Sequence, residues 1–248
     1  MKTVCVIPAR YESSRFPGKP LALIGNKPMV QWGYENALKV DDIDKVIVAT
    51  DHEEIYKVVE NFGGSAVMTS TDLPSGTDRV YEAVKNEEFD VIINLQGDEP
   101  FVAPKLLADL VNVFKNDEIE IVTPICRVDD ESELINPNVV GVVKDLNGFA
   151  LYFSRSQVPF FRDNEEAAEV MKKHIFYKHI GIYGYRKKCL EKLTKLKESS
   201  LEKSEKLEQL RFLENGYKIF TIVTDYNSVS VDTKEDLKKV NKMVSINY

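Results

Sequence analysis

Residues 4–20 read VCVIPARYESSRFPGKP. The run from Val4 to Ala9 is apolar or small, and it ends in a segment that carries the cations Arg10, Arg15 and Lys19. Continuous apolar runs of this length are typical of strands buried in a parallel sheet. Ligands bind at the carboxyl ends of such strands, where Arg and Lys hold phosphate or carboxylate groups. The stretch therefore predicts a buried strand followed by a loop that cradles a polyphosphate.

Two familiar phosphate-binding patterns do not fit this loop. The P-loop needs G-x-x-x-x-G-K followed by Ser or Thr, but Gly18-Lys19 precedes Pro20, and no glycine stands five residues before Gly18. The dinucleotide fingerprint G-x-G-x-x-G does not follow the first strand either. The remaining alternative is a solvated basic loop beside a structural strand, because charged side chains are common on protein surfaces.

Strand and helix patterns alternate through the first half of the chain. Short β-branched runs predict strands at 3–8, 45–50, 65–69, 90–95 and 120–125, and the segments between them predict helices near 28–39, 52–62, 77–88 and 103–115. This rhythm is typical of βαβ units. We therefore expect an α/β fold with a doubly wound, mostly parallel, Rossmann-like sheet. Right-handed crossovers would place every strand's carboxyl end at one edge of that sheet.

The rhythm changes after residue 130. Asn147-Gly148 is a hairpin signal between strand-like segments at 139–145 and 149–153. The remaining expected elements are one strand over 175–186, helices at 187–197 and 205–215, a strand at 218–223 and a final helix from 233. Segments 155–175 and 195–205 are the expected connections. We expect one domain over 1–248 with an inserted, partly antiparallel lobe at about 130–190.

Composition narrows the classes of function. The chain has 248 residues and a formal net charge of −7, which argues against nucleic acid as the main partner. Cys5, Cys126 and Cys189 have no close spacing, so they fit reduced thiols and no zinc pattern. There is no signal-peptide pattern, and no apolar run approaches the ~20 residues of a membrane span. The sequence predicts a cytoplasmic protein that binds neither nucleic acid nor membrane.

A carboxylate follows the strand that we expect at 90–95. The segment Gln96-Gly97-Asp98-Glu99-Pro100 places Asp98 at the expected ligand edge of the sheet. A hard carboxylate oxygen beside bound phosphates is the ligand that Mg²⁺ prefers. The alternative is that Asp98 caps the following helix and that Glu99 is merely solvated.

Two further segments have both a functional and a structural interpretation. Asp232 lies between a strand-like run and the last helix, where it is either an N-cap or a second metal ligand opposite Asp98. Residues 75–79, Ser-Gly-Thr-Asp-Arg, precede a helix. They either contact a ribose, base or phosphate through amides and hydroxyls, or they are ordinary helix-start residues.

Together these segments resemble the CMP-Kdo synthetases, which activate 3-deoxy-manno-octulosonate (Kdo). The resemblance runs nearly end to end in separate motifs, namely IPAR at 7–10, PGKPL at 17–21, ATD at 49–51, SGTDR at 75–79, QGDEP at 96–100, ALYFSR at 150–155, HIGIYGY at 179–185, LEQLR at 207–211 and VDT at 231–233. It implies a nucleotidyltransferase domain whose lobe at about 130–190 binds the sugar and forms a homodimer.

The implied reaction is attack by the anomeric hydroxyl of Kdo on the α-phosphorus of CTP, which yields CMP-Kdo and pyrophosphate for lipopolysaccharide biosynthesis. The resemblance implies Mg²⁺ as cofactor with Asp98 and Asp232 as its ligands, and these two residues with Lys19 and Arg10 as the catalytic set. The implied nucleotide-binding residues are Ala9, Arg10, Arg15, Lys19, Ser75, Gly76, Thr77, Gln96 and Gly97. The implied sugar-binding residues are Arg155, His179, Tyr185, Glu208 and Gln209.

The identity of the acceptor sugar stays open at this point. Taken alone, His179 and Tyr185 also fit a satisfied aromatic cluster, and 207–211 fits an ordinary amphipathic helix. The chain departs from many relatives at Gly141 and Ser230, and its segments 177–179 and 228–230 resemble the branch that uses 8-amino-Kdo. The acceptor is therefore Kdo, its 8-amino relative or another acidic sugar such as a sialic acid.

Overall fold

The computed structural model describes residues 1–12, 16–162 and 167–247, so Arg15 lies outside the described residues. The strands are β1 (Thr3–Ala9), β2 (Leu23–Ile24), β3 (Lys27–Pro28), β4 (Lys45–Thr50), β5 (Ala66–Met68), β6 (Val91–Asn94), β7 (Ile121–Arg127), β8 (Gly141–Lys144), β9 (Ala150–Ser154), β10 (Tyr177–His179), β11 (Tyr183–Arg186) and β12 (Phe220–Thr224). Within the described ranges, ten of them share one sheet in the order β5-β4-β1-β6-β11-β7-β10-β8-β9, with β12 paired to β7.

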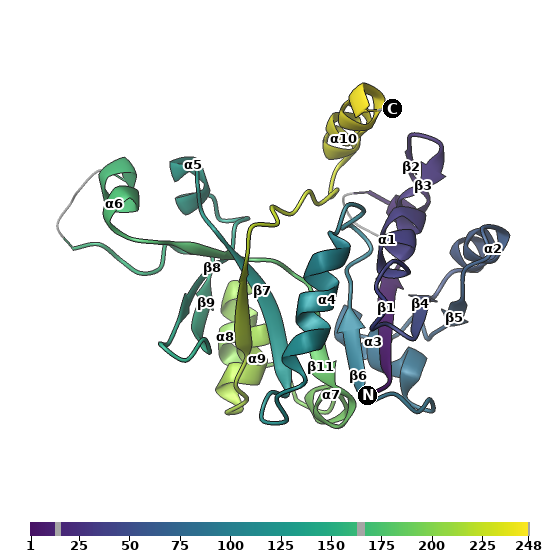
Figure 1. Ribbon diagram of the computed structural model, residues 1–248, viewed down its shortest axis with the longest axis horizontal. Coiled ribbons are helices and arrows are strands. Elements are labelled where there is room, and N and C mark those ends of the chain that lie inside the picture. The colour runs from purple at the N-terminus through teal and green to yellow at the C-terminus, as the bar shows by residue number, and fades with distance from the viewer. Residues whose placement is uncertain (13–15, 163–166, 248) are drawn as a thin grey trace.

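Helices lie on both faces of this sheet and beyond its edges (Figure 1). They are the 3-10 turn η1 (Lys19–Leu21) and the α-helices α1 (Met29–Ala37), α2 (Glu53–Asn61), α3 (Gly76–Val84), α4 (Pro104–Val113), α5 (Glu131–Leu134), α6 (Ala167–Lys173), α7 (Lys187–Leu193), α8 (Ser200–Glu205), α9 (Gln209–Glu214) and α10 (Lys234–Asn247). No helix among the described residues has both the length and the apolar character that a membrane crossing requires.

The two faces of β1 contribute to two separate cores. Cys5, Ile7 and Ala9 pack with α1, α2 and α4 on one face, whereas Val4 and Val6 pack with α3, α7 and α9 on the other. All five side chains are at most 1% exposed. A central strand that is covered on both faces must be apolar throughout, and β1 lies between the parallel neighbours β4 and β6. The predicted doubly wound, mostly parallel α/β sheet is confirmed.

The loops that follow β1 and β6 lie at the same edge of the sheet. Because β1 and β6 are parallel, their carboxyl ends point the same way, as the right-handed crossover rule requires. The loop after β6 comes very close to the end of β1. A Cβ added to Gly97 would lie only 2.9 Å from the carbonyl oxygen of Pro8, so only glycine allows this approach.

The expectation of one strand over 175–186 is wrong, because the structure has two strands there, β10 and β11, with a break at residues 180–182. β10 pairs with β7 and β8, and β11 pairs with β6 and β7, so the sheet divides between them. At the division the hydroxyl of Thr123 donates toward the carbonyls of Ile180, at 3.2 Å, and Ile182, at 2.8 Å. The Ile180 N–H still donates to the Pro124 carbonyl of β7 at 3.1 Å, but Pro124 has no N–H to return a bond, so the Thr123 side chain supplements an incomplete backbone ladder there. The predicted hairpin around Asn147-Gly148 is confirmed as the pair β8 and β9.

Two expectations about connections also need correction. α8 occupies part of the expected connection 195–205, because Ser199 and Glu202 form a capping box that starts this helix. The helix expected over 205–215 begins only at Gln209, because Lys206 adopts a left-handed φ of 54° that ends α8. The other expected connection, 155–175, contains α6.

The C-terminal helix lies beside the ligand edge of the sheet, on the β2–β3 hairpin. After β12, residues 225–233 run as an extended segment to α10 (Figure 1). Ile24 and Met29 form a small apolar cluster with Val231 and Val240. The side chain of Asn241 accepts a hydrogen bond from the Gly25 N–H and donates one to the Leu23 carbonyl. The C-terminal helix is thereby fixed on the β2–β3 hairpin, directly after η1.

Candidate active site

A cavity of about 240 Å³ opens at the carboxyl ends of β1 and β6. It is lined by Pro8, Ala9, Arg10, Glu12, Lys19, Pro20, Gly76, Gln96, Gly97 and Asp98. Seven of these ten residues belong to the predicted site, and the other three lie within the stretch 4–20. A larger cavity of about 800 Å³ beside Trp32, Phe101 and Val244 contains none of the predicted residues. The smaller cavity is therefore the candidate site, because it is the one lined by the predicted phosphate-binding and metal-binding residues.

Lys19 joins the two predicted metal ligands. Its Nζ lies 2.8 Å from Oδ2 of Asp98 and 3.1 Å from Oδ1 of Asp232. Burial disfavours the lysine charge, but the two carboxylates outweigh burial and raise the pKa of Lys19. A left-handed turn at Gly18, with φ of 69°, places this lysine at the start of η1. The Gly18 N–H donates to the Tyr11 carbonyl at 2.8 Å, which closes the loop.

Neither predicted metal ligand caps a helix. α4 begins only at Pro104, well after Asp98. The cap of α10 is Thr233, whose hydroxyl accepts the Asp236 N–H at 3.1 Å while the Asp236 carboxylate accepts the Thr233 N–H at 3.0 Å. The capping alternatives for Asp98 and Asp232 are therefore wrong, and both carboxylates face the lysine.

The two carboxylates fit a divalent cation. Asp98 and Asp232 offer hard oxygen atoms, and both lie within hydrogen-bonding distance of one cationic nitrogen, so these oxygens converge on a single region. Across residues 1–12, 16–162 and 167–247, no group of three His, Cys, Asp or Glu side chains could hold a metal. A magnesium ion held by these two carboxylates would complete its coordination with phosphate oxygens and water.

The other predicted nucleotide-side residues surround the same cavity. Arg10 donates from Nη2 to the Leu73 carbonyl at 2.7 Å, and Gln96 donates to the Asn94 side chain at 3.0 Å. Ser75 accepts the Asp78 N–H at 3.1 Å and caps α3. The helix-start interpretation of 75–79 is thus confirmed, and because Gly76 lines the cavity, the amino end of α3 lies where helices favour anions.

Glu99 departs from the expectation of a solvated side chain. It is only 6% exposed, and its carboxylate accepts hydrogen bonds from the hydroxyls of Tyr226 and Ser228. Burial raises the pKa of Glu99 to about 7, although the hydrogen bond from Ser228 opposes this shift. No local signal around residue 99 pairs it with residues more than a hundred positions later.

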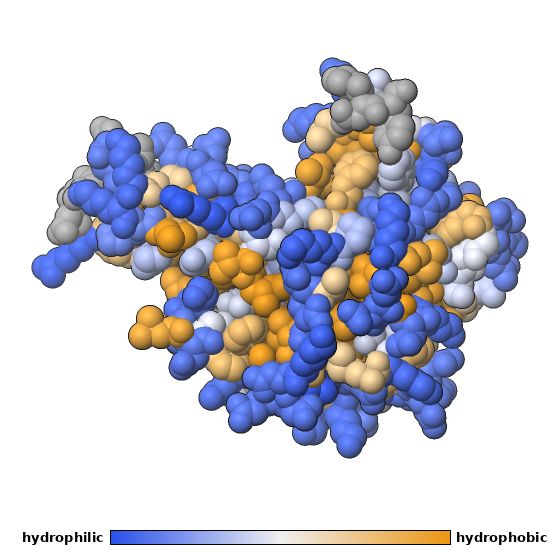
Figure 2. All heavy atoms as spheres, viewed as in Figure 1, coloured by the Kyte–Doolittle hydropathy of each residue, from blue (hydrophilic) through white to orange (hydrophobic). Residues whose placement is uncertain are grey.

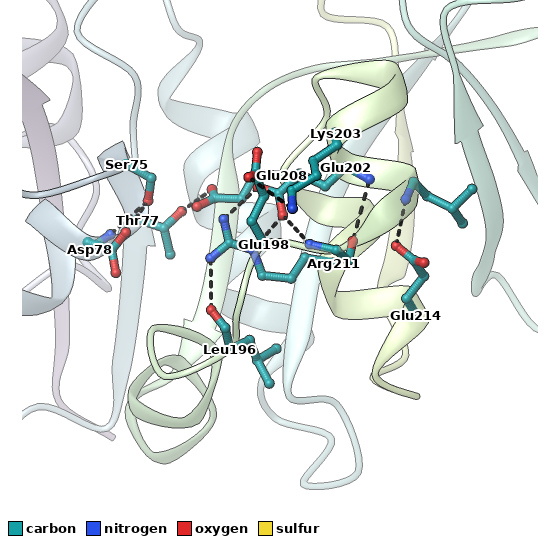
Figure 3. Close-up of polar contacts among 12 residues, drawn as sticks. Ser75, Thr77, Asp78, Leu196, Glu198, Glu202, Lys203, Glu208, Arg211 and Glu214 are labelled. Carbon is teal, nitrogen blue, oxygen red and sulfur yellow. Dashed lines mark hydrogen bonds and ion pairs between the residues drawn. The ribbon is translucent and has the colours of Figure 1, made fainter.

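Four of the predicted sugar-side residues lie along α9, β10 and β11, and one of them contacts α3. Thr77 donates from Oγ1 to Oε2 of Glu208 at 2.5 Å, and the two side chains point toward one another (Figure 3). Burial raises the pKa of both Glu208 and Tyr185. The hydroxyl of Tyr185 and Nε2 of Gln209 are buried without a well-formed hydrogen bond to the described residues. Buried polar atoms normally have partners, and hydrogen bonds from these two atoms to a sugar stay a prediction.

His179 stands at the division of the sheet. Its Nε2 lies 2.9 Å from Oγ1 of Thr123, and burial lowers the pKa of the imidazole to about 3. The ring is therefore neutral near pH 7 and acts through hydrogen bonds. It also belongs to an aromatic cluster with Tyr183, whose ring stacks on Tyr185 at 5.6 Å. The sequence interpretation missed Tyr183, although two residues apart in a strand share a face.

Arg155 contacts backbone carbonyls. It donates from Nε to Glu205 at 2.7 Å, from Nη1 to Pro137 at 2.9 Å and from Nη2 to Lys206 at 3.4 Å. The guanidinium therefore anchors the turn between α8 and α9, which leads to Glu208. A direct contact between Arg155 and a sugar stays a prediction.

A buried ion pair joins α9 to α8. Arg211 donates to both carboxylate oxygens of Glu202, at 2.7 and 2.5 Å (Figure 3). Each residue is 8% exposed, and Arg211 also donates to the Leu196 carbonyl at 3.2 Å. Forked Arg–carboxylate pairs of this kind restrict geometry strongly, so the start of α9 is held in place.

Comparisons with known proteins agree with this geometry. A family model described as cytidylyltransferase matches residues 4–219. A curated relative from Thermodesulfovibrio yellowstonii, named 3-deoxy-manno-octulosonate cytidylyltransferase, is 49% identical and covers 99% of each chain. A relative of the same name from Cytophaga hutchinsonii is 46% identical over 96% of this chain and 95% of its own length.

Solved structures share the fold. A CMP:2-keto-3-deoxy-manno-octonic acid synthetase complexed with CTP matches with a TM-score of 0.93 and 40% identity over 100% of both chains. A 4-diphosphocytidyl-2C-methyl-D-erythritol synthase from Anaerococcus prevotii gives a TM-score of 0.64 at 15% identity, covering 98% of this chain and 99% of its own. The second likeness concerns the fold alone.

Proposed function

The chain belongs to the cytidylyltransferase family, and from this premise we propose that it makes CMP-Kdo and pyrophosphate from CTP and Kdo. The observation that carries the proposal is the convergence of Lys19, Asp98 and Asp232 in the cavity at the carboxyl edge of the sheet. Relatives of 43–49% identity over nearly the whole length, all named 3-deoxy-manno-octulosonate cytidylyltransferase, support Kdo as the acceptor.

The nucleotide side of the reaction follows from the charges in the cavity. Arg10 and Lys19 would bind the triphosphate of CTP at the amino end of α3. Lys19 would neutralise the negative charge that grows as the bond between the α-phosphorus and pyrophosphate breaks. Magnesium, when bound by Asp98 and Asp232, supplies charge neutralisation of the triphosphate and lowers the pKa of the attacking hydroxyl.

The sugar side follows from the buried polar atoms. A sugar acid in the cluster around Glu208 would hydrogen-bond with the Tyr185 hydroxyl and the Gln209 amide, which lack well-formed bonds among the described residues. The neutral ring of His179 would contribute a hydrogen bond without charge. These contacts would orient the anomeric hydroxyl toward the α-phosphorus, and positioning of this kind is a major part of catalysis.

We further propose that the protein is a homodimer that joins through the lobe at about 130–190. This lobe exposes the large apolar side chains Ile135, Leu146, Leu151, Phe160 and Ile175. Figure 2 shows apolar residues gathered on the face that carries β8, β9 and β12. Exposed apolar patches of this kind mark interaction sites. Light scattering of the wild-type chain and of a Leu146→Asp, Phe160→Asp variant tests this, because a monomeric wild type would contradict it.

The free cysteines support a reducing compartment. Cys5, Cys126 and Cys189 are buried and unpaired in disulfides, which is usual for proteins of the cytoplasm. A cytoplasmic location also matches a reaction that consumes CTP. Cell fractionation with a tagged copy would test this part of the proposal.

Release of pyrophosphate is the direct test of the reaction. The purified chain with CTP and magnesium would be given Kdo, 8-amino-Kdo or a sialic acid in parallel. We expect release with Kdo, loss of release with EDTA, and loss in an Asp98→Asn variant that folds normally. Turnover confined to 8-amino-Kdo or to a sialic acid would change the acceptor but keep the reaction class. No turnover with any of the three acids would overturn the proposal.

A further inference from the structure

The segment that carries Asp232 has no helix or strand of its own. β12 ends at Thr224 and α10 begins at Lys234, and residues 225–233 cross between them as an extended strap (Figure 1). An extended segment lacks the repeating backbone hydrogen bonds that fix the path of a helix or a paired strand. Contacts with the rest of the protein must therefore decide where the Asp232 carboxylate lies.

Three contacts join the strap to the loop that carries Asp98. Tyr226 donates from its hydroxyl to Oε2 of Glu99 at 3.2 Å, and Ser228 donates from its hydroxyl to Oε1 of the same carboxylate. Val231 donates its N–H to the carbonyl of Asp98 at 3.0 Å. Tyr226 and Ser228 are two residues apart, so in an extended segment their side chains point to the same side. The buried carboxylate of Glu99 accepts a hydrogen bond from each of these two side chains.

Glu99 itself is held on the body of the protein. Its N–H donates to the Gln96 carbonyl at 3.1 Å, and the next carbonyl, of Pro100, accepts from Asn36 on α1 at 3.1 Å. A Cβ added to Gly33 on α1 would lie 3.6 Å from the Glu99 carbonyl oxygen, so helix and loop are in contact. The loop is therefore the fixed partner, and the strap is the part that is positioned.

We infer that Glu99 is a positioning residue, which holds residues 225–233 through Tyr226 and Ser228 so that Asp232 lies opposite Asp98. This inference rests on the proposed function, because it concerns how the two carboxylates come to share a magnesium–nucleotide complex. Lys19 is the shared partner of Asp98 and Asp232. Among the described residues, the Glu99 carboxylate bonds to Tyr226 and Ser228 and makes no hydrogen bond with Lys19. It acts on the site through the strap.

Nucleotide binding with and without magnesium tests this inference without turnover. Calorimetry would measure CTP affinity for the full chain in magnesium and in EDTA. We expect Glu99→Ala to reduce the gain in affinity from magnesium by about 10- to 100-fold, the range seen when residues that orient a metal ligand are removed, and to leave the affinity in EDTA unchanged. Hydrogen exchange in residues 225–233 should become faster.

A second variant separates positioning from the charge of Glu99. Tyr226→Phe with Ser228→Ala removes the same two hydrogen bonds from the strap side and keeps the carboxylate. We expect it to reproduce the Glu99→Ala result. Glu205→Ala is the matched control, because Glu205 also accepts a serine hydroxyl and a backbone N–H, from Ser154 and Arg155 at 2.8 Å each. The control should keep the full magnesium gain.

The outcomes are distinguishable. A full magnesium gain in either Glu99→Ala or the Tyr226, Ser228 double variant would overturn the inference and leave the proposed function standing. If the wild-type chain binds CTP no better with magnesium than with EDTA, the proposed function fails and the inference fails with it. If Glu99→Ala does not fold, the double variant decides the question alone.

Discussion

The ammonium of Lys19 lies 3.1 Å from a carboxylate oxygen of Asp232, although 213 residues separate the two in the chain. This contact joins the first loop of the protein to its last connection. It also predicts how the site responds when the lysine is removed. Lys19→Ala should lower kcat by about 10²- to 10³-fold, the usual effect of losing one preorganised charge in a site.

A second readout of Lys19→Ala does not depend on turnover. In the variant, Asp98 and Asp232 lose the ammonium that offsets their mutual repulsion. Bound magnesium should therefore raise the melting temperature of the variant more than that of the wild type. Lys27→Ala is the control, because Lys27 pairs with Glu35 on α1 at 2.6 Å, outside the cavity. Equal magnesium effects on variant and wild type would contradict the prediction.

Thr77 and Glu208 should be energetically coupled. Their 2.5 Å hydrogen bond links the nucleotide side to the sugar side. In a double-mutant cycle with Thr77→Val and Glu208→Gln, kcat/KM for Kdo should show a coupling of about 0.5–3 kcal/mol, as contacting residues do. Glu214→Gln is the control, because Glu214 lies on the same helix but bonds to Ser200. Additive effects of Thr77→Val and Glu208→Gln would count against a shared role.

Acid should destabilise the protein partly through His179. Burial lowers the pKa of this residue to about 3 in the folded state from 6.5. Below pH 6.5 the unfolded chain therefore gains a proton that the folded chain does not, and stability falls as the pH falls. Between pH 6.5 and about 5 this should remove up to about 1.5 kcal/mol.

Urea unfolding of His179→Gln checks this sign. The variant should lose less stability than the wild type over that pH range, whereas His174→Gln, with an exposed ring, should follow the wild type. A His179→Gln variant whose stability falls as steeply as that of the wild type would show that other groups dominate.

The ion pair between Glu202 and Arg211 should matter for folding. Both side chains are 8% exposed, so Glu202→Ala leaves a buried charge without its partner and should cost about 3–5 kcal/mol. Lys203→Ala on the same helix removes only an exposed pair with Glu198 at 3.8 Å, which is worth about 0–1 kcal/mol. Urea unfolding of the two variants measures the difference, and similar losses would contradict it.

The nucleotide side of the site could be predicted from the sequence because its signals are local. β1 is apolar on both faces, and the cations follow it within a few residues. One short stretch of sequence therefore predicts both the strand and the edge of the cavity. The same holds for Gly97 and Asp98 after β6. From the residues alone, the pairing of Asp98 with Asp232 is one of two interpretations. The resemblance to a family favours it, and the structure brings both carboxylates to one lysine.

What could not be predicted depends on contacts between distant residues. The break between β10 and β11 arises where the Thr123 hydroxyl meets two carbonyls of another segment, and no pattern within 175–186 reveals it. Glu99 reads as a surface residue until Tyr226 and Ser228 cover it. The guanidinium of Arg155 has a charge suited to a sugar acid, but its N–H groups donate to three backbone carbonyls nearby.

The separation of 213 positions between Lys19 and Asp232 has a consequence for biosynthesis. During translation the first loop and its lysine leave the ribosome early, and the parallel sheet can assemble before residues 225–247 have emerged. A nascent or prematurely terminated chain would then possess a folded body and a set of cations that attract nucleotides, yet lack the carboxylate needed to use them. Competence for the reaction would be acquired only after residue 232 has emerged and taken its place opposite Asp98.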